Sequence, residues 1–276
     1  MSIHSHGEHR YSYGGVVFHR LDGSRPELPM LGSADCDSYA TVTCTVSGHG
    51  DRCGSPAIRR RFKHVRATWD HARATVDGYG LHAQVRHIGS GRYVAAIEER
   101  YCDVSATAVE DLLTHVLLER SGGLVLHSAA IELDGEAIAF VGPSGAGKTT
   151  VSSMSACPWF AQDRLAVAPV EGVWHAWPLA GGSTPPGSEP SVRSSLPLGG
   201  VLRVVHSPRG PAVHPTSRVE ALMDVRMNCF PGDLSPADEG LRLANVEQLC
   251  HQVSVARFLS RLGTDPLPAL RAWRRA

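Results

Sequence analysis

The residues best suited to chemistry form one loop, which runs Gly142-Pro-Ser-Gly-Ala-Gly-Lys148-Thr149. It matches the pattern G-x-x-x-x-G-K-[ST], follows the apolar run 137–141 and precedes a segment that can begin a helix, as this motif requires. The glycines let successive backbone N–H groups turn inward around a phosphate chain. The positive end of the following helix favours the same anion. The loop therefore predicts a site for a nucleoside triphosphate.

Two side chains of this loop have separate expected roles. Lys148 can reach the β- and γ-phosphates, and Thr149 can offer its hydroxyl to Mg²⁺. The chain contains 27 Lys+Arg residues, but its only lysines are Lys63 and Lys148. We therefore expect ATP and Mg²⁺ as cofactors. The expected nucleotide-binding residues are Gly142, Pro143, Ser144, Gly145, Ala146, Gly147, Lys148, Thr149 and Thr150.

A histidine is expected to lie beside this loop because of a hairpin that precedes it. Asp134-Gly135 separates two apolar runs, which is a strong signal for a two-residue hairpin turn. In that register Leu133 faces Glu136, and His127 faces Gly142 at the mouth of the loop. A longer turn would shift the pairing and remove this prediction.

The elements before the loop begin with a β-rich region from residue 11 to about 103. Short alternating runs separated by turn residues predict its strands. These strands are expected at 15–18, 40–46, 74–76, 81–86 and 92–97, with a polar loop from Gly50 to Arg61. A helix is expected to begin at Thr107, whose capping box is completed by Glu110, and to end at Gly122-Gly123.

The elements after the loop begin with a helix from Lys148 to about Ala156. One strand from Trp159 to Val167 should follow, with Asp163 near its middle, and its hairpin partner should lie across Glu171-Gly172. Later elements are expected as a loop at 181–190, a strand at 198–205, and helices at 217–230, from 235, and at 266–274. The apolar face of the second helix is expected to contain Leu243, Val246, Cys250 and Val253.

Composition limits the classes of partner. The formal net charge of +0 over 276 residues provides no global field that would attract nucleic acid or an acidic membrane. No apolar stretch is long enough for a transmembrane helix, and the N-terminus lacks the apolar core of a signal peptide. Seven scattered cysteines without a C-x-x-C pair are typical of reduced thiols. We expect a cytoplasmic protein that binds neither nucleic acid nor membranes.

One metal-site alternative involves the N-terminal cysteines. Cys36, Cys44 and Cys53 can be grouped with His49 as zinc ligands, but their spacings match no common pattern.

Two signatures of common P-loop classes are missing from the chain. It contains neither an Asn-Lys-x-Asp guanine-binding motif nor a Leu-Ser-Gly-Gly-Gln transporter motif. The residues from Leu124 to Val167 instead resemble the catalytic domain of the HPr serine kinase/phosphorylase family, which is related in fold to phosphoenolpyruvate carboxykinase. The resemblance is carried by Leu126-His-Ser-Ala-Ala130, by the loop from Gly142 to Thr150, and by Ala161-Gln-Asp-Arg164.

This resemblance implies a fold class and a division into domains. The implied fold is α/β, with a P-loop kinase domain of the HPr kinase/PEP carboxykinase type that contains a mixed sheet and covers residues 104–276. A smaller β-rich domain would cover residues 1–103. The parent family forms hexamers, so a homo-oligomer is compatible with the resemblance.

The resemblance also implies site residues, with one departure. The family's active-site histidine maps onto His127, and its loop Lys and Ser/Thr map onto Lys148 and Thr149. The family's strand ends Ala-Asp-Asp-Arg, and its first Asp accepts the proton of the substrate hydroxyl; Gln162 occupies that position here. An amide cannot accept a proton as a carboxylate does. The family's later Glu-x-Arg-Gly signature, which supplies a metal ligand, is also missing.

Four interpretations of this departure stay open. Asp163 serves as the base, His127 does, the strand is shifted by one residue, or the chain has lost kinase chemistry. The candidate catalytic residues are therefore Asp163, His127, Lys148 and Gln162, and the candidate metal ligands are Thr149 and Asp163. Arg164 is a further candidate for phosphate binding, whereas nothing in the spacing selects Glu171 or Glu189.

The resulting expectation is an ATP-dependent kinase resembling HPr serine kinase. It would transfer the γ-phosphate to a hydroxyl of a protein or peptide acceptor, and some relatives in this broader group resemble enzymes that modify ribosomally made peptides. One alternative is a nucleotide-binding regulatory or assembly protein with impaired catalysis. Another is a small-molecule P-loop kinase or an ordinary P-loop NTPase.

Overall fold

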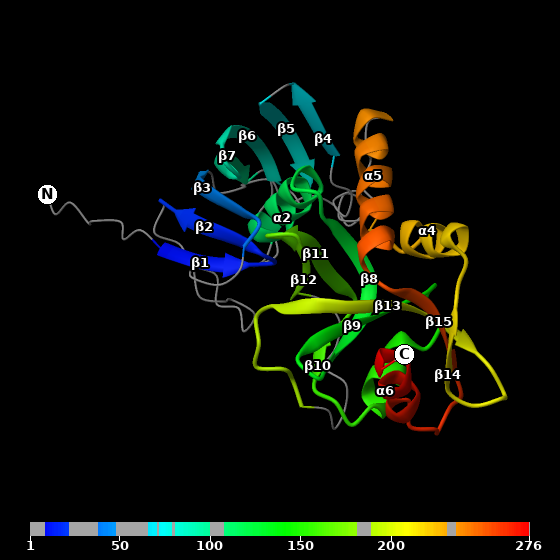
Figure 1. Cartoon of the computed structure of the whole chain (residues 1–276). Coiled ribbons are helices and arrows are strands. Elements are labelled where there is room, and N and C mark those ends of the chain that lie inside the picture. The colour runs from blue at the N-terminus through cyan, green and yellow to red at the C-terminus, as the bar shows by residue number, and fades with distance from the viewer. Residues whose placement is uncertain are drawn as a thin grey trace, which may run out of the picture. The chain divides into compact units, whose positions relative to one another are not determined.

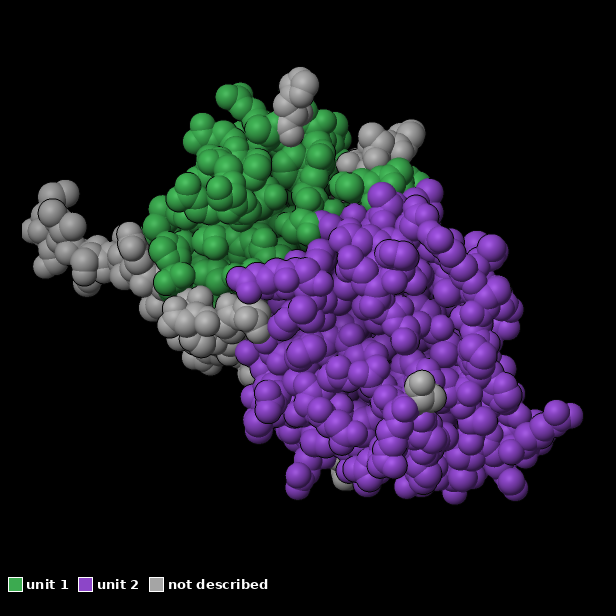
Figure 2. Space-filling model, viewed as in Figure 1, with its two compact units in different colours: residues 1–121, 231–241 green, residues 122–230, 242–276 purple. Residues whose placement is uncertain are grey.

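The chain folds into a mixed α/β protein with two sheets (Figure 1). The computed structural model describes residues 9–21, 38–47, 66–70, 72–78, 81–99, 108–180, 189–230 and 236–275. Two compact units are distinguished in Figure 2, one of residues 1–121 and 231–241 and the other of residues 122–230 and 242–276. The α/β class expected from the sequence is confirmed. In these described ranges, no helix has both the length and the apolar character needed to cross a membrane.

Unit 1 contains a seven-stranded mixed sheet in the order β1-β2-β3-β7-β6-β5-β4. Its strands are β1 (His9–Tyr13), β2 (Val16–Arg20), β3 (Ala40–Ser47), β4 (Arg66–Asp70), β5 (Arg73–Gly78), β6 (Leu81–Gly89) and β7 (Arg92–Glu99). The five predicted strands are confirmed, whereas β1 and β4 are additional. Both additional strands are five residues long, and each has only two alternating apolar or aromatic residues, Tyr11 and Tyr13 in β1 and Ala67 and Trp69 in β4, which is a weak signal for a strand. The predicted loop from Gly50 to Arg61 lies outside the described residues.

Helix α2 (Ala108–Arg120) belongs to unit 1 and is held there by buried polar contacts. The Tyr11 hydroxyl donates to Glu110 Oε1 at 2.6 Å, and the Tyr13 hydroxyl donates to Asp111 Oδ1 at 2.7 Å. The sequence predicts a domain boundary between residues 103 and 104, but the units divide after Ser121 because α2 bonds to β1 of unit 1.

The expected end of α2 is confirmed, since Gly122 follows it with a φ of 84°. Thr107, the expected capping residue, lies outside the described residues.

Unit 2 contains an eight-stranded mixed sheet. Its strands are β8 (Leu124–Leu133), β9 (Glu136–Val141), β10 (Trp159–Ala161), β11 (Arg164–Val170), β12 (Val173–Pro178), β13 (Leu196–His206), β14 (Ala212–Pro215) and β15 (Val255–Ser260). The order is β10-β8-β11-β12-β13-β15-β14, and β9 pairs with both β8 and β13. β13 runs parallel to β9 and β15, while the remaining pairs are antiparallel. Strands β14 and β15 were not among the predicted elements.

The hairpin between β8 and β9 has the predicted two-residue turn. Leu133 pairs with Glu136, and the ladder continues to Ser128 paired with Val141. Asp134 and Gly135 both adopt left-handed backbone conformations, with φ of 52° and 85°, as the tight hairpin turn requires. His127 therefore lies one residue beyond the last position of β8 that pairs with β9.

The single strand predicted from Trp159 to Val167 is wrong. It is divided into β10 and β11 by a kink at Gln162-Asp163, because Asp163 has a φ of 69° in the left-handed region. Aspartate tolerates this conformation better than most residues because its short side chain can bond locally. β10 pairs with β8 near Ala130, and β11 pairs with the earlier part of β8, from Leu124 to His127. The kink lies opposite the middle of β8.

The helices of the second half are α3 (Lys148–Met154), α4 (Arg218–Arg226), α5 (Pro236–Gln252) and α6 (Leu267–Arg275). All four are predicted, but α4 ends at Arg226 and not at Phe230. Its capping box is formed by Ser217 and Glu220. On the predicted apolar face of α5, Val246 is buried and Cys250 is partly buried, but Leu243 is 49% exposed. Val253 is also buried and lies just after the helix, and Leu249 is an additional buried residue.

Candidate functional site

The predicted phosphate loop connects β9 to α3, both of which are anchored in the core. The residues from Ala137 to Val141 are fully buried, and Val151 of α3 is buried in the same layer as Phe140. The loop needs its glycines, because Gly145 and Gly147 have φ of 80° and 91°. A Cβ atom at Gly142 would lie 3.0 Å from that of Ala146. The buried elements on both sides therefore anchor the ends of the loop, and the glycines allow its turns.

Lys148 has its ammonium group at the centre of three acceptors. Its Nζ donates to Gly142 O at 2.8 Å, to Pro143 O at 3.2 Å and to His127 Nε2 at 3.1 Å. The residue is buried, and this burial lowers the pKa of Lys148, while the negative charge of Asp163 acts in the opposite direction. The lysine thus links the phosphate loop to β8.

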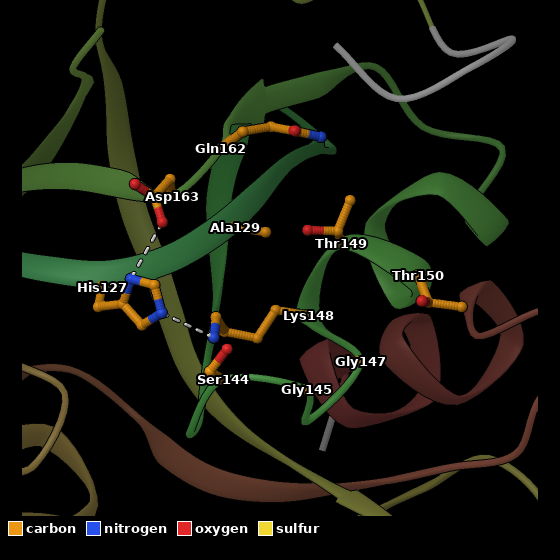
Figure 3. A pocket seen from close by; sticks show the side chains of 10 residues that line it. All are labelled: His127, Ala129, Ser144, Gly145, Gly147, Lys148, Thr149, Thr150, Gln162 and Asp163. Carbon is orange, nitrogen blue, oxygen red and sulfur yellow. Dashed lines mark hydrogen bonds and ion pairs between the residues drawn. The ribbon is translucent and has the colours of Figure 1, made fainter. Parts of the chain in front are cut away.

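His127 links Lys148 to Asp163, as the dashed lines in Figure 3 show. His127 Nδ1 lies 3.2 Å from Asp163 Oδ1. Because an ammonium group can only donate, the bond from Lys148 leaves the lone pair on Nε2 and the proton on Nδ1, which faces the Asp163 carboxylate. The ring of Phe230 meets that of His127 edge-on, with centroids 6.2 Å apart. These contacts hold the imidazole in one orientation and one tautomer.

The loop and the Asp163–His127 pair line one cavity of about 470 Å³. Its lining residues are His127, Ala129, Ser144, Gly145, Gly147, Lys148, Thr149, Thr150, Gln162 and Asp163. All four candidate catalytic residues therefore lie in the same cavity as the loop. Of the expected nucleotide-binding residues, Gly142, Pro143 and Ala146 are not part of the lining, although two of them hold Lys148 through their carbonyls.

Gln162 and Asp163 both face this cavity because of the kink between β10 and β11. In an unbroken strand, neighbouring side chains point to opposite faces. The left-handed φ of Asp163 breaks that alternation, and the bond from Ser128 N to Asp163 O at 3.2 Å fixes the turned backbone. The predicted straight strand would have directed only one of these two side chains into the cavity.

The cavity contains groups that suit a phosphate-bound magnesium ion. Thr149 and Asp163, the candidate ligands, both line it, and Asp163 is the only carboxylate among the lining residues. Within the described ranges, no group of three or more His, Cys, Asp or Glu side chains could hold a metal ion by itself. Mg²⁺ commonly takes only one or two protein ligands beside substrate phosphates and water. The two candidate ligands therefore fit Mg²⁺ bound together with a nucleotide, but not an all-protein metal site.

Asn228 supports the loop, and the sequence contains no signal for this role. Its Oδ1 accepts from Gly142 N at 2.9 Å, its backbone carbonyl accepts from His127 N at 2.7 Å, and its Nδ2 donates to Asp224 O at 2.7 Å. Asp224 is itself buried and pairs with Arg203 at 3.0 Å. Asn228 thus holds the first residue of the loop and the backbone of the candidate base together.

The remaining sequence candidates lie outside the cavity lining. The Arg164 guanidinium donates to Ala180 O and lies over the ring of Phe230. Glu171 forms the turn between β11 and β12, and Glu189 precedes the bridge between Pro190 and Trp159. None of these three residues is positioned as a phosphate or metal ligand in this cavity.

The cysteines show no disulfide in the described ranges. Cys44, Cys157, Cys229 and Cys250 are thiols there, as predicted. Of the residues grouped as a zinc alternative, only Cys44 is among those described, so that alternative falls outside the structure.

Comparison with known proteins yields no match to any family model and no match to a curated protein.

Proposed function

We propose that this chain is an ATP-dependent phosphotransferase resembling HPr serine kinase, with a P-loop kinase domain in unit 2. Its acceptor is a hydroxyl of a protein or peptide. The observation that carries the proposal is a single cavity in which a complete phosphate loop lies opposite an Asp163–His127 pair. Phosphoryl transfer depends on positioning and on neutralising the phosphate charge, and on a group that receives the proton of the acceptor. Both kinds of group line this cavity.

In the proposed reaction, the acceptor oxygen bonds to the γ-phosphorus and the bond from that phosphorus to the bridging oxygen breaks. ADP leaves, and the hydroxyl proton passes to His127 Nε2. Asp163 keeps the Nδ1 proton in place and stabilises the imidazolium that forms. Lys148 donates to His127 Nε2 in this structure, so it must turn to the phosphate oxygens before that lone pair can act. Nucleotide binding thereby uncovers the base.

Mg²⁺ would be held by the Thr149 hydroxyl and by the carboxylate of Asp163. When bound there, it would neutralise part of the negative charge of the phosphates. Gln162 is not proposed as the base, because its amide cannot accept the proton.

The direct test is incubation of the purified protein with γ-labelled ATP, Mg²⁺ and a desalted extract of its own host, beside a Lys148→Ala control. We expect a labelled protein or peptide that forms only with the wild-type chain. The same labelling with Lys148→Ala would contradict the site, and no labelling at all would contradict transfer.

Nucleotide binding can be tested separately because the chain has only two lysines, Lys63 and Lys148. An acyl-phosphate derivative of ATP acylates a lysine that lies beside its phosphates. We expect mass spectrometry to find the label on Lys148 and to find that excess ATP prevents it, with Lys63 as the internal control. Equal, ATP-insensitive labelling of both lysines would contradict a nucleotide site at the loop.

A second candidate function is a nucleotide-binding regulatory or assembly protein without turnover. Gln162 favours it, since the family that the chain resembles has a proton-accepting carboxylate at that position. Tight Mg·ATP binding without transfer to any acceptor, together with transfer gained in Gln162→Asp, would support this function over the first.

A further inference from the structure

Gln162 has a buried amide whose nitrogen lacks a partner. The residue is only 4% exposed, and no hydrogen-bond acceptor for its Nε2 occurs in the part of the chain that the structure describes. A buried donor without a partner is costly, and buried polar groups are almost always paired. Because Gln162 also lines the cavity of the phosphate loop, a turn of its side chain would bring this buried nitrogen to a ligand bound there.

The backbone carbonyl of Gln162 already accepts a hydrogen bond, so the side chain is the part of this residue that can bind a ligand. Arg164 N donates to Gln162 O at 2.9 Å, and β10 ends at Ala161 against β8. The kink at Asp163 then directs both neighbouring side chains into the cavity. In Figure 3 the Asp163 carboxylate lies on the His127 side, whereas the Gln162 amide extends toward the Thr149 side.

The chemistry of the amide limits the kind of ligand. An amide nitrogen is a donor without a usable lone pair, so it selects an acceptor oxygen and cannot ligate a metal ion. The charged residues among those lining the cavity are Lys148 and Asp163, and the neutral amide adds no negative charge. A carboxylate at this position would repel a phosphate oxygen, but the amide attracts it.

We propose that Gln162 recognises the terminal phosphate of the nucleotide by donating from Nε2 to a γ-phosphoryl oxygen. This inference rests on the proposed function, because it assumes a nucleotide whose β-phosphate is held by the loop. Gln162 lies on the β10–β11 side of the cavity and not in the loop itself, so only a phosphate that extends beyond the loop reaches it. Gln162 therefore distinguishes a nucleoside triphosphate from a diphosphate and takes no part in proton transfer.

The test compares binding of Mg·AMP-PNP and Mg·ADP by calorimetry in the wild type, Gln162→Ala and Gln162→Glu. In Gln162→Ala we expect the affinity for AMP-PNP to fall about tenfold or more, the usual effect of losing a hydrogen bond to a charged group. The affinity for ADP should stay within about twofold. Gln162→Glu should bind AMP-PNP more weakly than Gln162→Ala, because its carboxylate faces the same phosphate. The exposed Gln248→Ala is the matched control and should leave both affinities unchanged.

Each other outcome has a distinct meaning. Equal losses of AMP-PNP and ADP affinity would make Gln162 structural and overturn the inference, as would an unchanged preference for AMP-PNP. In both of those cases the wild type still binds nucleotide, so the proposed function survives. A wild-type protein that binds neither nucleotide would overturn the proposed function and this inference together.

Discussion

At the residue scale, the site depends on one backbone conformation and one chain of contacts. The left-handed φ of Asp163 brings its carboxylate to 3.2 Å from His127 Nδ1, and His127 Nε2 accepts from Lys148 at 3.1 Å. The contacts run in the order Asp163–His127–Lys148, whereas the sequence named these residues without an order. In the proposed reaction Asp163 orients the imidazole, His127 accepts the proton and Lys148 binds phosphate.

The first prediction concerns His127 as the base. His127→Ala should lower the rate of transfer about 10²- to 10⁴-fold, the usual contribution of a general base. The affinity for ATP should change little, because phosphate binding depends on the loop. Single-turnover rates and ATP binding measured separately will distinguish these effects, with the exposed His251→Ala as control. A wild-type rate in the His127→Ala variant would contradict this role and would indicate Asp163 as the base.

The second prediction concerns Asn228, which positions the loop without lining the cavity. Asn228→Ala leaves Gly142 N without its acceptor and should reduce the free energy of unfolding by about 1–3 kcal/mol. The affinity for ATP should fall as well, because the first glycine of the loop is released. Asn228→Asp retains the acceptor for Gly142 N but loses the Nδ2 donor to Asp224 O, so urea unfolding should show a loss of stability for this variant too, while more of the ATP affinity is kept. Unchanged ATP affinity in Asn228→Ala would show that the loop does not need this contact.

At the element scale, tight turns and close packing determine where the site elements lie. The β8–β9 hairpin closes over Asp134-Gly135, and the β11–β12 hairpin closes over Glu171-Gly172 in the same left-handed conformations. These turns set the registers of the strands on either side of the phosphate loop. The other end of β9 and β13 is closed by α6, where Arg274 bonds to Gly199 O and Glu136.

The third prediction concerns the packing of α6 on β13. A Cβ atom at Gly200 would lie 2.3 Å from Trp273 Cη2 and 3.2 Å from Ser254 O, so Gly200→Ala should displace α6. We expect a loss of about 1–3 kcal/mol in the free energy of unfolding, typical of overpacking. Gly240→Ala is the matched control, because it belongs to α5 and its Cβ would meet no atom of the described residues within 4 Å beyond its own helix backbone and chain neighbours. In that control the free energy of unfolding should increase by up to about 1 kcal/mol.

Combining Gly200→Ala with Trp273→Ala distinguishes a steric clash from any other effect. The double variant should lose less stability in urea than the sum of the two single variants. If the double variant loses as much stability as the two single variants together, the steric clash between position 200 and Trp273 is contradicted.

At the scale of the whole molecule, the two units bury different kinds of polar group. Unit 2 contains the cavity lined by Lys148 and Asp163, whereas unit 1 contains Glu110, a fully buried carboxyl group bonded to Tyr11 and Arg20. Burial raises the pKa of Glu110 above its ordinary value, although its bonds to Tyr11 and Arg20 act in the opposite direction. The stability of unit 1 is therefore expected to depend on pH through this group.

The fourth prediction follows from the sign of that shift. A carboxyl group whose pKa is raised by folding contributes stability below its unfolded pKa, and this contribution is lost as the pH rises through the folded pKa. The wild type should therefore lose stability relative to Glu110→Gln as the pH increases from about 4.5 upward. Urea unfolding of both proteins at several pH values measures this difference, and the exposed Glu98→Gln is the control. A difference that grows in favour of the wild type at higher pH would contradict the buried-carboxyl interpretation.

By itself, the sequence determined the features that depend on neighbouring residues. The glycine-rich loop between β9 and α3, the β8–β9 register and the position of His127 all followed from glycines, turn residues and alternation within about twenty residues of chain. Local patterns suffice there because a tight turn allows few conformations. They failed for β14 and β15, whose pairing depends on the distant strand β13, and for Leu243, which is exposed although its spacing is that of an apolar face.

Only the tertiary structure decided how the site is completed. A left-handed Asp163 turns two adjacent side chains into one cavity, and no local pattern requires that conformation. Asn228 reaches Gly142 across 86 residues of sequence, and α2 joins unit 1 through side chains 98 and 99 positions away. Such contacts form only when separate segments pack together, and their energies depend on burial that the sequence does not display.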